Sequence, residues 1–232
     1  ELGSISKTCT ATLTVQAVQD GKLALVDTVG RHVPELKDSP IGAVRLLDLG
    51  THTGGGFPLP PGSKDAVLLP LLAGGVYTAH AKSADGAGGV VLVEVYDAPA
   101  PDVRSRLVNL STRTRVGVGE DELIAGFVIE GAGPSRLLLR GVGPGLAAFG
   151  VTGPLAQPTL TLKSKLGDTI QRNQGWRSGN NAVDIASAAG LVGAFAIEPA
   201  DCAMVVTLAP GQYTVQVGGV GGATGEGLVE IY

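Results

Sequence analysis

Short segments in which apolar and polar residues alternate recur along the chain, and turn-forming residues separate them. In residues 91–96, valines at every second position alternate with Leu, Glu and Tyr, and a period of two is typical of a β-strand. Similar short apolar runs predict strands at 12–15, 22–26, 106–111, 123–130, 135–140, 159–162 and 169–171. Dipeptides such as Asp20-Gly21 and Gly167-Asp168 favour tight turns between them. The pattern therefore predicts an all-β chain of short antiparallel strands.

The end of the chain repeats a segment from its first half. Residues 228–232 (LVEIY) repeat residues 92–96 (LVEVY), and the two segments 65–96 and 201–232 align without a gap. Tyr77 and Tyr213, each followed by Thr, share the same offset of 136 (213 − 77). Identity at several positions with one offset predicts an internal duplication.

The duplication is unequal, and it sets the predicted organisation. Residues 12–96 correspond to 159–232, whereas 104–158 have no counterpart upstream. We therefore predict one complete unit preceded by part of another. The N-terminal extension spans residues 1–11 and the partial unit spans 12–97. A linker that contains Pro99 and Pro101 spans 98–104, and the complete unit spans 105–232. About eight strands and a helical crossover near 182–191 make the complete unit an antiparallel β-sandwich.

The partial unit lacks the strands that would cover one of its faces or edges. It could share strands within 106–130, form a small sheet by itself, or accept a strand from a neighbouring subunit. The N-terminal extension is the candidate donor of that strand. A head-to-tail contact of this kind does not close, and it builds a filament of copies of the chain. The strand-donor candidates are Leu2, Ile5, Thr8 and Thr10.

Several segments together resemble a known repeat module. They are RLVNLSTR (106–113), LIAGFVI (123–129), LLRGVGP (138–144), PTLTL (158–162) and the closing LVEIY. This set is similar to an immunoglobulin-like repeat module of large secreted and cell-surface proteins of environmental bacteria. The resemblance covers 104–232 well and 12–96 partially. It implies an immunoglobulin-like β-sandwich with an extracellular, non-catalytic role, and it brings no catalytic residues.

Composition and charge narrow the class of protein. The chain has 232 residues, of which 44% are hydrophobic, with 36 glycines and 14 prolines, which suits many short strands joined by turns. A net charge of −4 gives no reason to expect a nucleic-acid partner. The longest apolar run, 66–77, contains Pro70 and is too short to span a membrane. The chain opens at Glu1 without a methionine, so we expect a processed protein or a fragment.

The two cysteines, Cys9 and Cys202, are disulfide candidates. If the protein is secreted they can form one bond, within a chain or between neighbouring chains; the alternative is two buried free thiols. Two distant cysteines do not form a metal site, and we expect no metal or cofactor.

Other candidate sites have a plainer interpretation beside the functional one. The glycines of GVGPG (141–145) follow a strand as in a nucleotide-binding loop, but the spacing favours a turn before a short helix. His32, His52 and His80 lie without ligand spacing and fit solvated loops or faces. Trp176 and Arg177 are candidate ligand contacts, with the tryptophan either stacking on a sugar or capping the end of the sandwich.

Two functions fit these patterns. The first is a non-enzymatic structural subunit of an extracellular bacterial assembly, a fibre or a surface layer, that associates through β-strand complementation. The alternative is a cell-surface adhesion or glycan-binding module. In both cases we expect a secreted protein, no membrane span and no catalytic residues.

Overall fold

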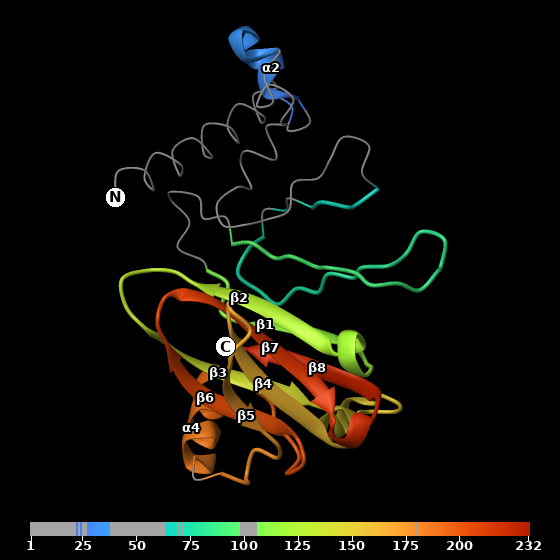
Figure 1. Cartoon of the computed structure of the whole chain (residues 1–232), viewed down its shortest axis with the longest axis vertical. Helices are drawn as coiled ribbons and strands as arrows, with labels where there is room; N and C mark the ends of the chain where they lie inside the picture. The colour runs from blue at the N-terminus through green and yellow to red at the C-terminus, as the bar shows by residue number, and fades with distance from the viewer. Residues whose placement is uncertain are drawn as a thin grey trace. The chain divides into compact units, whose positions relative to one another are not determined.

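The computed structural model describes residues 22, 24, 27–37, 64–68, 70, 72–97, 106–179 and 181–232 (Figure 1). The chain divides into two compact units, residues 1–106 and 107–232, and each is considered by itself. The predicted linker 98–104 and the N-terminal extension 1–11 lie outside the described residues. The elements are α2 (Val29–His32), η1 (Pro34–Leu36), β1 (Leu110–Val116), η3 (Gly119–Asp121), β2 (Leu123–Ile129), β3 (Ser135–Val142), η4 (Pro144–Phe149), β4 (Pro158–Ser164), β5 (Thr169–Asn173), α4 (Ala182–Val192), β6 (Cys202–Leu208), β7 (Gly211–Gly219), η5 (Val220–Gly222) and β8 (Gly225–Ile231).

The second unit, which we call the two-sheet unit (residues 107–232), consists of two four-stranded sheets. Sheet 1 has the strand order β1-β8-β3-β6, and sheet 2 has the order β2-β7-β4-β5. Every ladder between these strands is antiparallel. The coarse prediction, antiparallel strands in an all-β unit, is therefore confirmed for the described residues.

The two sheets share one apolar core, to which every strand except β5 contributes buried side chains. On β4, Leu160 and Leu162 are fully buried, whereas Thr159, Thr161 and Lys163 between them are only partly buried. The inward residues of both sheets form one cluster, which includes Val116, Leu139, Met204, Val215, Val217 and Val229. Burial of this apolar surface is the main term that stabilises the unit.

Helix α4 covers the outer face of sheet 1 (Figure 1). Its Ile185 and Ala188 pack with Leu138 of β3 and Ala203 of β6 in a second, smaller cluster. The helix ends at Gly193, whose positive φ of 69° suits a glycine at a helix C-cap. The predicted crossover helix near 182–191 is thus present at nearly the predicted bounds.

The first predicted strand of this unit is displaced. The sequence pattern predicts a strand at 106–111, but β1 begins at Leu110 and continues to Val116. Its bounds are set by the ladder with β8, which runs from Leu110 opposite Ile231 to Val116 opposite Gly225. Tertiary pairing therefore decided the bounds against the local pattern.

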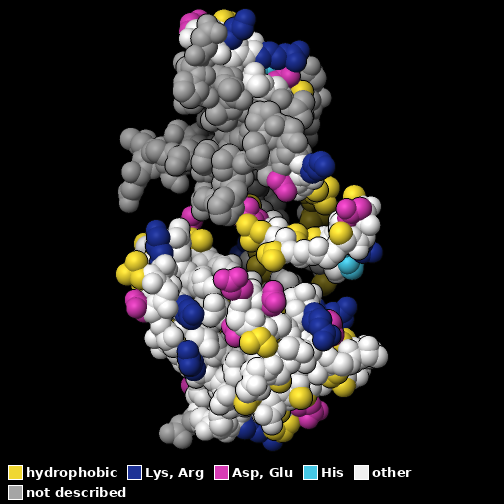
Figure 2. Space-filling view, turned by 45° about the vertical axis from the view of Figure 1, so that its right-hand side comes forward, with side chains coloured by type: hydrophobic (Ala, Val, Ile, Leu, Met, Phe, Trp, Pro, Cys, Tyr) yellow, Lys and Arg dark blue, Asp and Glu magenta, His cyan; other side chains and the backbone are white. Residues whose placement is uncertain are grey.

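The described part of the first unit contains helical turns and no strand. The predicted strands within 64–97 are absent from residues 64–68, 70 and 72–97 as the structure describes them, which is a correction to the prediction for 91–96. The segment 72–97 runs out and back as an irregular loop (Figure 1). Val76 and Val90 are 99% and 98% exposed, and hydrophobic side chains of this segment lie at the surface (Figure 2).

Among the described residues, none of the helices has the length and apolar character needed to cross a membrane.

Candidate functional site

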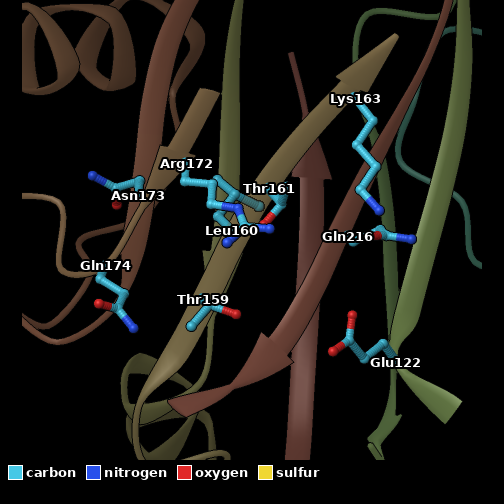
Figure 3. A pocket seen from close by; sticks show the side chains of 9 residues that line it. All are labelled: Glu122, Thr159, Leu160, Thr161, Lys163, Arg172, Asn173, Gln174 and Gln216. Carbon is cyan, nitrogen blue, oxygen red and sulfur yellow. The ribbon is translucent and has the colours of Figure 1, made fainter. Parts of the chain in front are cut away.

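A polar hollow of about 560 Å³ lies on the outer face of sheet 2. It is built from strands β4, β5 and β7 together with Glu122, the residue just before β2 (Figure 3). The lining residues are Glu122, Thr159, Leu160, Thr161, Lys163, Arg172, Asn173, Gln174 and Gln216. These include three charged and five uncharged polar side chains, and no aromatic residue.

The strand register brings these polar side chains into rows across the sheet. Thr161 of β4 lies opposite Arg172 of β5 on one side and Gln216 of β7 on the other. The three residues share one face because paired residues of neighbouring strands project to the same side. This row presents a hydroxyl, a guanidinium and an amide to a ligand (Figure 3).

A glycine makes room for the carboxylate in the neighbouring row. Thr159 of β4 lies opposite Gly218 of β7, and a Cβ placed on Gly218 would lie 2.7 Å from Oε1 of Glu122. The missing side chain therefore leaves the space in which the Glu122 carboxylate sits. Lys163, in the row on the other side of Thr161, adds an ammonium on the same face. The hollow thus offers both donors and acceptors, with two cations and one anion.

The glycine loop at 141–145 already holds an anion of its own chain. The carboxylate of Asp201 accepts hydrogen bonds from the N–H groups of Gly143 (2.7 Å) and Gly145 (3.0 Å), and from that of Glu198 (2.7 Å). Burial raises the pKa of the Asp201 carboxyl, while these donors oppose the rise. The loop precedes the short helix η4, as the turn interpretation predicts.

Trp176 lies beneath helix α4 rather than in the hollow. Its ring packs with the apolar cluster of α4, and its indole N–H donates to the carbonyl of Glu198 at 3.0 Å. The guanidinium of Arg177 lies 4.8 Å from the centre of the ring. The two candidate contacts are therefore brought together beside the small apolar cluster, and the choice between a structural cap and a sugar contact stays a prediction.

Cys202 is fully buried in the core. Its thiol donates to the carbonyl of Pro158 at 3.0 Å and contacts that of Asn173 at 3.3 Å. Burial raises the pKa of this thiol to about 11. Cys9 lies outside the described residues, as do the strand-donor candidates Leu2, Ile5, Thr8 and Thr10, so the disulfide and the strand donation stay predictions.

The described histidines do not gather into a metal site. His32 contacts Asp27 at 2.8 Å, and Arg31 contacts the same carboxylate at 2.6 Å. The hydrogen bond from the N–H of Ala24 is the main cause that lowers the pKa of Asp27, and the hydrogen bond from His32 lowers it further. Within the described residues, no group of three or more His, Cys, Asp or Glu side chains could hold a metal ion.

Comparisons with known proteins concern mainly the first unit. A family model described as Beta-lactamase matches residues 1–83. A beta-lactamase of Lysobacter lactamgenus is 51% identical over 59 residues, which are 25% of this chain and 15% of that protein. Those of Pseudomonas fluorescens and Escherichia coli K12 are 48% and 42% identical over 59 residues, 25% of this chain and 16% of each protein. The chain thus spans about 15% of the length of these relatives.

One solved structure is similar in part to the chain. It is the pre-peptidase C-terminal domain of a collagenase from Bacillus anthracis, with a TM-score of 0.33 and 11% sequence identity. The likeness covers 53% of this chain and 89% of that domain.

The beta-lactamase matches correct one prediction of the sequence analysis. The expectation that the chain is not an enzyme is contradicted, because a family of hydrolases matches residues 1–83. Ser4-Ile5-Ser6-Lys7 fits the pattern Ser-x-x-Lys, in which the serine is a nucleophile of beta-lactamases and penicillin-binding proteins. This four-residue signal was available in the sequence and was missed. It lies outside the described residues.

The residues of the hollow were also missed. The signal for them was the alternation at 159–163, where two leucines predict an inward face and Thr159, Thr161 and Lys163 the opposite one. The alternation predicts the strand, but it does not show which residues lie beside its polar face.

Proposed function

We propose that the chain contains part of a serine hydrolase of the beta-lactamase type, with Ser4 as the nucleophile. The observation that carries the proposal is the match of the Beta-lactamase family model to residues 1–83, which include the Ser-x-x-Lys pattern. Identities of 42% to 51% over 59 residues with relatives from three genera support it.

The proposed chemistry is acyl transfer. The hydroxyl oxygen of Ser4 attacks the carbonyl carbon of the lactam ring, and Lys7 accepts the proton as the base. The ring C–N bond then breaks, and the nitrogen takes up a proton. The product is an ester between Ser4 and the opened ring, so the mass of the protein rises by that of the whole lactam. Water hydrolyses the ester and restores the serine.

The test is covalent labelling of the whole chain with a fluorescent penicillin, followed by intact-mass measurement. The printed sequence contains neither Ser-Asp-Asn nor Lys-Thr-Gly, the other two motifs of this chemistry. The readout is therefore covalent labelling of the serine rather than turnover of the lactam. We expect one adduct, lost in Ser4→Ala and kept in the neighbouring control Ser6→Ala. A chain that takes no label, or that labels equally in Ser4→Ala, contradicts the proposal.

A second function is favoured by the hollow on sheet 2. We infer that the two-sheet unit is an immunoglobulin-like β-sandwich that holds a polar ligand, a glycan, outside the cell. The clustered hydroxyls, amides and charged groups of the hollow support this proposal, since sugars need donors and acceptors at close spacing. Two cations against one anion favour a glycan that carries a carboxylate.

A glycan array probed with the whole chain tests this second function. Arg172→Ala and Gln216→Ala should each weaken binding of an acidic glycan at least tenfold, because each removes a donor from the central row. Arg113→Ala on β1 is the matched control, since this exposed arginine lies on sheet 1 and its loss should leave binding unchanged. Failure to bind any glycan, or equal loss in all three variants, would exclude this role for the hollow.

Head-to-tail assembly by strand donation is a further proposal for this extracellular unit. Its donor, within residues 1–11, lies outside the described part of the chain. Deletion of residues 1–10 should abolish association in sedimentation experiments while the two-sheet unit stays folded. Polymers that persist after the deletion would show that another segment makes the contact.

A further inference from the structure

Residues 65–96 carry the sequence of the last three strands of the two-sheet unit. When 65–96 are aligned with 201–232, 13 of the 32 positions are identical and no gap is needed. The identical positions include a glycine beside each predicted turn and the Leu-Val-Glu of strand β8. The region 201–232 contains β6, β7 and β8, which we call the closing strands.

The two segments also share local geometry, although only one of them forms strands. Three features recur at the offset of 136 residues: two tyrosine hydrogen bonds and one left-handed glycine. In the first, Tyr77 Oη donates to the carbonyl of Ala73 at 2.9 Å, as Tyr213 Oη does to that of Ala209 at 3.0 Å. In the second, Tyr96 Oη donates to the Glu94 carboxylate at 2.8 Å, as Tyr232 Oη does to that of Glu230 at 3.0 Å. The third is the positive φ of Gly86 (76°) and of Gly222 (79°). These three local features are therefore kept in both copies, although the backbone forms strands in only one of them.

The closing strands cannot form a sheet by themselves. In the two-sheet unit, β6 pairs with β3, β7 with β2 and β4, and β8 with β1 and β3. The three strands never pair with one another, so every ladder partner belongs to the region of β1 to β4. The sequence upstream of 65–96 has no counterpart of β1, β2 or β3. This explains why residues 72–97 keep the local features and yet contain no strand.

We propose that residues 65–96 are a second set of closing strands, which competes with residues 201–232 for β1 to β4 of the same chain. In the structure, Thr112 of β1 lies opposite Val229, and Leu110 lies opposite Ile231. After the exchange, Val93 takes the place of Val229 and Val95 that of Ile231. Residues 97–109 then join the incoming strand to β1 as the loop of an antiparallel hairpin, which keeps the exchange local in sequence.

Three replaced positions explain why residues 201–232 occupy the sheets in the structure. Gly227 becomes Val91 in the exchanged form, and a Cβ at Gly227 would lie 2.5 Å from Cγ2 of the buried Val116. The buried Val215 and Val217 become Ala79 and Ala81, which leaves space in the core. Overpacking and cavities both lower stability, so the exchanged form is the minor population.

Two other positions bear on the exchange, one of which is replaced and one of which is kept. Gly218 becomes Lys82, whose Cβ would lie 2.7 Å from Oε1 of Glu122, so the carboxylate has to move before it can pair with the lysine ammonium. Gly225, whose Cβ would meet the backbone of Leu155 at 2.7 Å, is still a glycine at Gly89. The segment 65–96 thus retains this glycine, whereas Gly219, whose Cβ would lie 2.0 Å from the carbonyl oxygen of Ala223, becomes Ser83.

Disulfide trapping in the whole chain tests the exchange. In a background of Cys9→Ser and Cys202→Ala, Thr112→Cys is combined with Val93→Cys to trap the exchanged form and with Val229→Cys to trap the observed one. Thr112→Cys with Val76→Cys is the matched control, because Val76 belongs to the same exposed segment and corresponds to Gln212 of β7, in the other sheet. Mild oxidation is followed by non-reducing gels and peptide mapping.

We expect the 112–229 bond to form almost completely and the 93–112 bond to form slowly, but at least tenfold faster than 76–112. Val229→Asp, which places a charge in the core, should speed formation of the 93–112 bond a further tenfold and leave the rate of the 76–112 bond unchanged. Equal rates for 93–112 and 76–112, with or without Val229→Asp, would overturn the proposal. So would 93–112 bonds found only between chains.

Discussion

Arg140 and Glu230 form an ion pair inside the two-sheet unit, with 3.1 Å between Nε and Oε2. Both side chains are buried on the outer face of sheet 1, and the Arg140 guanidinium lies 4.2 Å from the centre of the Phe195 ring. Tyr232 donates to the other carboxylate oxygen at 3.0 Å. Burial raises the pKa of Glu230, and the charge of Arg140 opposes that rise.

Removal of one partner of this pair should cost more than removal of both. Arg140→Met leaves a buried carboxylate and should lower the free energy of unfolding by about 3–5 kcal/mol, the usual cost of an uncompensated buried charge. Arg140→Met with Glu230→Leu should recover most of that loss. Urea unfolding followed by the fluorescence of Trp176 measures both. If the double variant is as unstable as the single one, the pair is not the source of the cost.

Gly143, whose N–H binds the Asp201 carboxylate, should tolerate no side chain. A Cβ there would lie 2.0 Å from the carbonyl oxygen of Leu155, although φ is −125° and not in the left-handed region. Gly143→Ala should therefore lower the free energy of unfolding by about 2 kcal/mol or more through steric clash alone. Gly190→Ala in α4 is the matched control. Its Cβ meets nothing within 4 Å, and it should raise stability by about 0.5–1 kcal/mol in the same urea titration.

The strands of the two-sheet unit could be predicted from the sequence because local pattern and tertiary environment agree there. At Leu160 and Leu162 the period of two matches a buried face, and the strand forms as predicted. At 91–96 the same kind of pattern predicts a strand that the structure does not contain. A strand needs a ladder, and residues 1–64 contain no sequence counterpart of β1, β2 or β3. Pattern alone therefore finds strand-compatible segments, while pairing decides which of them become strands.

The stability of the two-sheet unit should fall in alkaline solution. The pKa of the Cys202 thiol rises from 9.0 to about 11 on folding, so the folded protein holds this proton to higher pH than the unfolded one. The contribution is complete below about pH 9 and is lost as pH rises through 11. It amounts to at most about 3 kcal/mol, at about 1.4 kcal/mol per pKa unit. Tyr232, with a pKa raised to about 12, acts in the same direction.

Cys202→Ala should flatten the loss of stability between pH 9 and 11, measured as urea midpoints across this range. At pH 8, a thiol reagent should modify Cys202 only as fast as the unit unfolds, because the thiol is both buried and protonated. Rapid modification of the folded protein at this position would show that the core opens at Cys202.

Substitutions of Trp176 distinguish its two proposed roles, a structural cap at the end of the sandwich and a surface on which a sugar stacks. Because the ring packs with Leu138 and Ile185 beneath α4, Trp176→Ala should lower the free energy of unfolding by about 2–4 kcal/mol. Trp176→Phe keeps the ring contacts but loses the bond to Glu198, and it should cost about 1 kcal/mol. Chemical denaturation followed by circular dichroism gives both values. An unchanged stability in Trp176→Ala, with loss of glycan binding, would favour the platform.

The candidate sites were harder to predict than the fold. Arg172 and Gln216 are 44 residues apart in the sequence (216 − 172) and meet only because both strands flank Thr161 on β4. No local signal contains that register. Ser4 and Lys7, by contrast, are readable as a local motif, although a four-residue pattern gains weight only from the match to a family over residues 1–83.

The pairing of Leu110 with Ile231 has a mechanical consequence. These residues are the first of β1 and the last of β8, and they lie side by side at one end of the ladder. A force that pulls the two-sheet unit apart at residues 107 and 232 acts at one end of this ladder. It would therefore break the β1–β8 hydrogen bonds one pair after another, starting at Leu110 and Ile231. Bonds broken in sequence resist far less tension than bonds sheared together. We therefore expect the unit to yield at a low force when it is loaded at these two ends.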